Sequence, residues 1–99
     1  MIIVDKLFGG FPYEGEDRPW IKKGDVRQWC HMTSTESVEE LLEFGKSIGL
    51  KEAWLQKGRY IHFDLTPNKR KQAIKAGATE VTPQKLVKHS VAIGKKIPE

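Results

Sequence analysis

The amino-acid sequence predicts a small α/β domain, built on a mixed sheet of about four to five strands with three helices. Short runs of β-forming residues alternate with amphipathic segments along the chain, and this order is typical of α/β folds. Two Thr-Pro pairs, at Thr66 and Thr82, have the composition of a helix start. We expect a single domain over residues 1–94 of the 99, followed by a frayed basic tail at 95–99.

The predicted strands follow from two patterns of side chains. Residues 2–4 form a continuous apolar run, as in a strand covered on both faces, whereas residues 26–32 and 60–65 alternate between two faces. Shorter extended segments are expected at 53–55 and 78–81. Because the turn at Lys57-Gly58 can join antiparallel neighbours, the sheet is expected to be mixed. Residues 8–25 lack periodicity and predict an aromatic loop insertion.

The three predicted helices have recognisable start and stop signals. Thr33 and Glu36 have the spacing of a capping box, and the other two helices begin with threonine followed by proline. Glycine at the far end of a helix is typical of a left-handed cap. We expect the helices to begin at Thr33, Thr66 and Thr82 and to end at Gly49, Gly77 and about Gly94.

Composition and charge narrow the class of protein. The chain has no apolar run long enough to cross a bilayer, so no membrane partner is expected, and its lone cysteine, Cys30, favours a reducing cytoplasm. Residues 1–56 carry seven Lys or Arg against ten Asp or Glu, whereas residues 57–99 carry ten against three. The resulting net charges of −3 and +7 favour a phosphate-bearing partner for the second half, although single lysines can simply solvate helix faces.

Polar side chains gather at the ends of the predicted strands. His62 and Asp64 share one face of the 60–65 strand, and His31 ends the 26–32 strand. In α/β sheets, ligands collect at the carboxyl ends of strands. The helix that follows at Thr66 offers free backbone donors and the positive end of its dipole. The ligand-binding residues expected from these patterns are His31, Gln56, Arg59, His62, Asp64, Thr66, Lys69 and Arg70.

An ordered set of short motifs resembles a known family, the domain of unknown function 4031 family, over roughly residues 1–88. The residues that carry the resemblance are Ile3-Val4-Asp5, Cys30-His31-Met32, Gly49-Leu50, Trp54-Leu55-Gln56, His62-Phe63-Asp64-Leu65, Lys69-Arg70, Ala73 and Gly77-Ala78. The chain departs from the family by Phe63, where tyrosine is common, and by its basic tail. The resemblance implies a compact cytoplasmic domain from a bacterium or a bacteriophage and supplies no established activity.

The leading hypothesis is non-enzymatic binding of a phosphate-bearing small molecule, such as a nucleotide or a nucleotide-derived signal, by a homo-oligomer without a cofactor. In a phage, this activity would sequester a host defence signal. One alternative is a metal-assisted phosphoester hydrolase or nuclease, in which His31, His62 and Asp64 are catalytic or, together with Asp5, hold a divalent metal. A His–Asp pair that only ties down a strand end is the commoner structural meaning of such residues. A third hypothesis is a nucleic-acid or protein-binding adaptor.

Overall fold

The computed structural model describes residues 1–12 and 26–95, including all their side chains except those of residues 10–12, 26 and 27. The elements in chain order are β1 (Ile2–Val4), β2 (Phe8–Pro12), β3 (Val26–Ser34), α1 (Val38–Ser47), a turn of 3-10 helix (Glu52–Trp54), β4 (Phe63–Leu65), α2 (Pro67–Lys75), β5 (Thr79–Glu80) and α3 (Pro83–Gly94). The α/β class, with three α-helices and a mixed sheet of five strands in these residues, is therefore confirmed.

The long strand β3 organises the sheet. Its first residues pair with β2 and its last three with β1, both antiparallel, while β4 pairs with residues 30–32, also antiparallel. The sheet continues from β1 to β5 through a parallel pair, and this pair makes it mixed. β3, which carries His31, therefore lies between β1 and β4, because Met32 pairs with both Val4 and Phe63.

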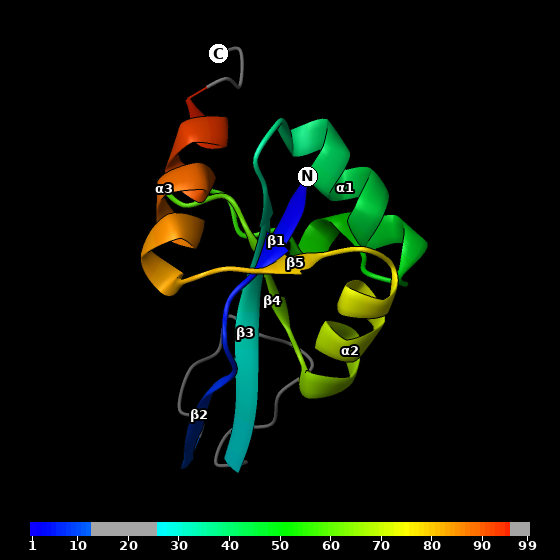
Figure 1. Cartoon of the computed structure of the whole chain (residues 1–99), viewed down its shortest axis with the longest axis vertical. Helices are drawn as coiled ribbons and strands as arrows, with labels where there is room; N and C mark the ends of the chain where they lie inside the picture. Colours follow the sequence, from blue (N-terminus) through cyan, green and yellow to red (C-terminus); the bar gives the residue numbers. More distant parts are fainter. Residues whose placement is uncertain (13–25, 96–99) are drawn as a thin grey trace.

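The helices lie on both sides of the sheet, with α3 on one side and α1 and α2 on the other (Figure 1). Phe63 packs toward α1, because a Cβ on Gly45 would come within 2.8 Å of its ring. Met32, Leu65 and Leu41 are fully buried in the same core. Among the described residues, no helix combines the length and the apolar character needed to cross a membrane.

The helix caps follow the sequence signals at α2 and α3. The Thr66 hydroxyl accepts a hydrogen bond from the Lys69 backbone N–H, and Thr82 does the same for Lys85. Proline occupies the first helical turn in both cases. Gly49 ends α1 with a φ of +84°, the left-handed conformation predicted for it.

Several predicted boundaries are wrong. Helix α1 begins after Ser37, whose side chain caps the Glu40 N–H, and not at Thr33, which stays in β3 and donates its hydroxyl hydrogen to the Ile61 carbonyl. Residues 53–55 lie in and directly after the 3-10 turn instead of forming a strand. The expected loop at 8–25 begins with a strand, β2, because Phe8 and its neighbours pair with β3. Its remainder, 13–25, and the tail at 96–99 lie outside the described residues.

Candidate metal centre

Three neighbouring strands place Asp5, His31 and Asp64 in one row across the sheet. His31 on β3 is directly opposite Asp64 on β4. On the other side of β3, the backbone N–H of Asp5 donates to the His31 carbonyl at 3.2 Å, one step beyond the Val4–Met32 pair. Residues opposite each other in an antiparallel ladder point to the same face of a sheet. The three side chains therefore meet on one face.

His62 completes the group because it precedes Asp64 by two residues and shares its face. Its Nε2 lies 3.5 Å from Asp64 Oδ1, and His31 Nε2 lies 3.7 Å from the same oxygen. The two imidazole rings meet edge to face, with their centroids 5.0 Å apart. One ligating atom from each of His31, His62 and Asp64 lies within 4.8 Å of the others, and we call these three residues the His-His-Asp cluster.

Hydrogen bonds on the far side of each ring leave its Nε2 as the ligating atom. His31 Nδ1 lies 2.8 Å from Asp5 Oδ2, and the other oxygen of that carboxylate accepts the His31 backbone N–H at 2.7 Å. His62 Nδ1 lies 2.9 Å from the Tyr60 carbonyl oxygen, which can only accept a hydrogen bond. Both Nδ1 atoms thus carry the proton in the neutral rings, and both Nε2 lone pairs face Asp64. Histidine ligands in metal sites are oriented in this way.

Burial separates the carboxylates from the rings. The side chains of Asp64 and Asp5 are 0% and 4% exposed, whereas those of His31 and His62 are 29% and 18% exposed. Phe8 stacks on the His31 ring with centroids 4.9 Å apart and further restricts its orientation. The carboxylates therefore form the floor of the cluster, and the imidazoles remain within reach of a solvent-borne ligand.

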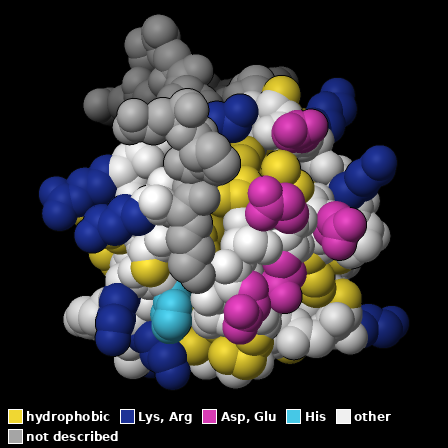
Figure 2. Space-filling view, turned by 90° about the horizontal axis from the view of Figure 1, so that it is seen from above, with side chains coloured by type: hydrophobic (Ala, Val, Ile, Leu, Met, Phe, Trp, Pro, Cys, Tyr) yellow, Lys and Arg dark blue, Asp and Glu magenta, His cyan; other side chains and the backbone are white. Residues whose placement is uncertain are grey.

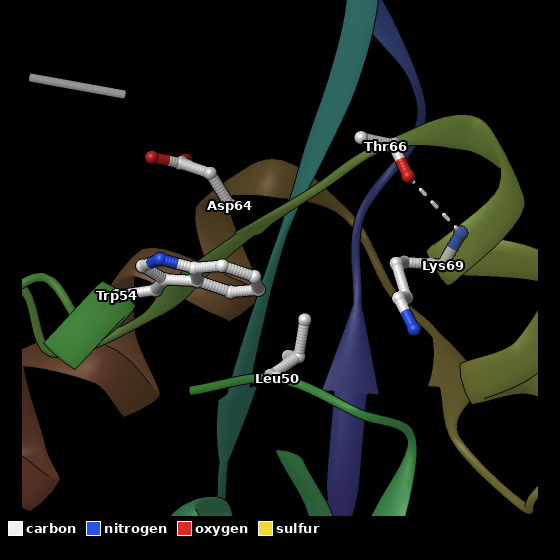
Figure 3. Close-up of a pocket in the computed structure, with 5 residues that line it drawn as sticks. All are labelled: Leu50, Trp54, Asp64, Thr66 and Lys69. Atoms are coloured by element: carbon white, nitrogen blue, oxygen red, sulfur yellow. Dashed lines mark hydrogen bonds between the residues drawn. The ribbon is translucent and has the colours of Figure 1, made fainter. Parts of the chain in front are cut away.

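The structure does not bring Lys69 and Arg70 to this cluster. The Lys69 ammonium donates to the Ile48 carbonyl at the end of α1. Figure 3 shows the Asp64 carboxylate directed away from Leu50 and Lys69, although both residues line a small pocket with it. The cations beside the helix N-terminus therefore stabilise the fold and do not join the histidines.

Arg70 also has a structural role. Its Nε donates to the Asp5 carbonyl at 3.0 Å, and its terminal nitrogen lies 3.2 Å from a Glu80 carboxylate oxygen. These contacts connect α2 to the ends of β1 and β5. Arg70 thus holds the backbone of Asp5 in position, and the carboxylate of Asp5 in turn orients His31.

The other predicted ligand residues divide between the cluster and the fold. Gln56 forms an antiparallel bridge with His62 through both backbone hydrogen bonds, which places it beside the cluster. The Arg59 guanidinium lies over the Tyr60 ring at 5.6 Å. Thr66 is occupied as the cap of α2. Cys30 is fully buried, and burial, reinforced by the Asp5 carboxylate, raises its pKa to about 12, so its thiol stays protonated and inert.

A cavity beside the cluster includes residues that the sequence patterns did not single out. His31, Tyr60 and His62 line it together with three residues of α3, Leu86, Val87 and Ser90, and its volume is about 230 Å³. Sequence periodicity marks Leu86 and Val87 only as helix positions. Their proximity to the histidines results from the packing of α3 on β3, which no local signal encodes.

Acidic and basic side chains are unevenly distributed over the surface. In the view from above, Asp and Glu side chains gather on one part of the surface and Lys and Arg side chains lie around its margin (Figure 2). The first turn of α1 supplies Glu39 and Glu40, and exposed lysines such as Lys71 and Lys88 lie on α2 and α3. These helix lysines fit the solvating role that the sequence left open for them.

Comparison with known proteins identifies the family of this chain. A family described as protein of unknown function (DUF4031) matches residues 17–92, which is more than half of the chain and includes the whole His-His-Asp cluster. The chain belongs to this family. No curated protein and no solved structure matches it significantly. The DUF4031 assignment agrees with the resemblance found in the sequence and leaves the chemistry to be inferred from the site.

Proposed function

We propose that the protein holds a divalent transition-metal ion at the His-His-Asp cluster and uses it to bind and hydrolyse a phosphoester. One observation carries the proposal: the Nε2 atoms of His31 and His62 lie 3.7 and 3.5 Å from Asp64 Oδ1, and each Nδ1 is tied to an acceptor. Two histidines and one carboxylate are a donor set that zinc and iron use in proteins. The buried Asp5 carboxylate behind His31 corresponds to the outer partner that such sites require.

Charge supports a phosphate as the ligand of this centre. Two neutral imidazoles and one carboxylate leave a bound divalent ion with a net positive charge, and three protein ligands leave coordination positions open. A divalent ion at an open site supplies Lewis acidity toward a phosphoryl oxygen. The proposed metal centre would then take the anion-binding role that the sequence assigned to Lys69 and Arg70.

Metal analysis of the purified protein tests the first part of the proposal. We expect about one Zn²⁺ or Co²⁺ per chain by mass spectrometry and titration calorimetry, with a cobalt absorption spectrum typical of few-coordinate nitrogen and oxygen ligands. His62→Ala and Asp64→Asn should abolish this binding. His89→Ala is the matched control, because His89 is the remaining histidine of the chain, lies on α3 and is outside the cluster. A folded wild-type chain that binds none of these ions would refute the metal centre.

Turnover tests the second part. The metal-loaded protein should release p-nitrophenol from p-nitrophenyl phosphate or its bis-ester, with chelation or His62→Ala removing the activity. Nucleotides and cyclic dinucleotides are the next substrates to examine. Activity that survives both chelation and His62→Ala would assign hydrolysis to a contaminant.

Capture without turnover is the second candidate function. It is favoured by the cavity beside the cluster, which suits a small molecule. In a phage, such binding would sequester a nucleotide-derived defence signal of the host. Tight, metal-dependent binding of an intact nucleotide, with no product formed over hours, would select this function over hydrolysis.

The cellular setting and assembly state also belong to the proposal. A cytoplasmic location suits the reduced, fully buried Cys30. A homo-oligomer suits a cluster whose imidazoles remain partly exposed, because a second chain would then complete the walls of the site. Analytical ultracentrifugation with and without metal measures this directly, and a monomer in both states would contradict self-association.

A further inference from the structure

The cavity beside the His-His-Asp cluster has an apolar wall and a polar end. Tyr60, Leu86 and Val87 supply the wall, and the two imidazoles supply the end. Leu86 and Ser90 are buried, whereas Tyr60 and Val87 remain 43% and 44% exposed. Two large side chains thus line a cavity while remaining partly exposed, as residues of a ligand-binding wall do.

The polar groups of the cavity are prearranged. The Arg59 guanidinium lies over the Tyr60 ring at 5.6 Å, which restrains the ring and places a positive charge beside one of the lining residues. Ser90 donates its hydroxyl hydrogen to the Val87 carbonyl at 2.9 Å, so its oxygen can only accept a further hydrogen bond. An incoming ring would therefore meet an aromatic side chain, an aliphatic wall and one hydrogen-bond acceptor.

We propose that this cavity is a subsite for the nucleobase of a nucleoside monophosphate, with the phosphate directed at the His-His-Asp cluster. The placement of the phosphate rests on the proposed function, whereas the placement of the nucleobase rests on the residues that line the cavity. Pockets for drug-sized ligands usually enclose about 300–1,000 Å³. A cavity of about 230 Å³ has room for one ring system.

Titration calorimetry on the Zn²⁺-loaded protein tests the subsite with three probes: AMP, ribose 5-phosphate and adenosine. Stacking on an aromatic side chain contributes enough to change affinity by about 5- to 150-fold per base. We therefore expect AMP to bind about tenfold or more tighter than ribose 5-phosphate. Tyr60→Ala and Val87→Trp should remove this difference, whereas Tyr60→Phe should keep it. Both side chains are partly exposed, so these variants are expected to fold.

Ile74→Trp is the matched control, because Ile74 is 40% exposed on α2 and is not part of the cavity. Equal affinities of the wild type for AMP and ribose 5-phosphate would overturn the subsite, as would an AMP preference that survives Tyr60→Ala. Weak binding of adenosine that Tyr60→Ala abolishes, in a protein that binds neither Zn²⁺ nor ribose 5-phosphate, would support the subsite and refute the metal centre. The two proposals therefore fail separately.

Discussion

The two faces of the sheet differ in composition although the same strands form them. Toward α1 and α2, β3 and β4 present Met32, Phe63 and Leu65, each at most 1% exposed, in a continuous apolar core. On the opposite face, the same strands present His31 and Asp64, with a buried carboxylate beside an imidazole. Burial of ionisable groups costs free energy that apolar packing does not. One face therefore carries the apolar core against α1 and α2, and the other carries the cluster to which the proposed metal centre is assigned.

The sharpest contrast lies between adjacent residues of one segment. Phe63→Ala should lower the free energy of unfolding by about 3–5 kcal/mol, because a ring packed against Gly45 of α1 leaves a cavity. His62→Ala should change it by less than about 1 kcal/mol when no metal is present, because its ring is partly exposed. Denaturation in guanidinium chloride with EDTA measures both values.

Phe63→Leu is the matched control for this pair, since it keeps an apolar side chain in the core and should cost less than Phe63→Ala. A loss of stability in His62→Ala comparable to that in Phe63→Ala would show that the His-His-Asp cluster stabilises the fold as the apolar core does. The distinction between the two faces would then disappear.

Bound metal should stabilise the folded protein, because it would offset the free-energy cost of burying ionisable groups at the His-His-Asp cluster. A ligand that binds only the folded state at about 100 times its Kd adds roughly 2.7 kcal/mol to the free energy of unfolding. We expect Zn²⁺ to raise the melting temperature of the wild type accordingly and EDTA to reverse the effect. Asp64→Asn should show no such rise, whereas His89→Ala should behave as the wild type does. An equal rise in Asp64→Asn would locate the bound metal elsewhere.

The sequence predicts what depends on local alternation and capping. The period of two puts His62 and Asp64 on one face and Phe63 on the other, whereas the position of His31 opposite Asp64 depends on the tertiary pairing of β3 with β4, which no local pattern encodes. The Thr66 and Thr82 caps are local as well, because a threonine can reach an N–H three residues ahead. The shared face of His62 and Asp64 and the two caps are therefore predictable from the order of residues along the chain.

The sequence fails where a side chain has a choice of partners. Lys69 follows a helix start, which suggests an anion site, yet its long side chain reaches the Ile48 carbonyl of another helix. Thr33 and Glu36 match a capping box, yet strand pairing holds Thr33 in β3 and leaves the cap to Ser37. Both outcomes depend on tertiary packing, which outweighs a local signal worth about 1 kcal/mol.

Asp5→Asn tests how strongly the row across the sheet supports the metal. The asparagine keeps nearly the same volume, but its single oxygen can replace only one of the two carboxylate oxygens that accept from the His31 backbone N–H and from His31 Nδ1, and it removes the negative charge that polarises the ring. Loss of an outer partner of this kind usually weakens metal binding by about 10- to 100-fold. Calorimetry with Zn²⁺ should show this loss, while circular dichroism remains unchanged. Unaltered metal affinity would show that Asp5 does not orient a ligand.

The smallest effects are expected at the helix starts, where they decide between two anion sites. Thr66→Ala and Thr82→Ala should each lower the free energy of unfolding by about 1 kcal/mol, since each removes one capping hydrogen bond. Urea denaturation measures this cost, and the corresponding serine variants should recover most of it. Neither alanine variant should change the affinity of the Zn²⁺-loaded protein for ribose 5-phosphate.

Thr66 is the informative member of this pair, because it caps the helix whose N-terminus the sequence marked as an anion site. Thr66 lies only two residues after Asp64 in the sequence. A fall in phosphate affinity in Thr66→Ala therefore has two explanations, a disturbed Asp64 or a lost phosphate contact. Lys69→Ala distinguishes the two, since the Lys69 ammonium donates to the Ile48 carbonyl at the end of α1 and Figure 3 shows the Asp64 carboxylate directed away from Lys69. One result would place the phosphate at the start of α2. Thr66→Ala and Lys69→Ala would both weaken ribose 5-phosphate binding about tenfold or more, with Zn²⁺ affinity unchanged, whereas Thr82→Ala would bind ribose 5-phosphate as the wild type does. The polar face would then hold a metal without being the place where the anion binds.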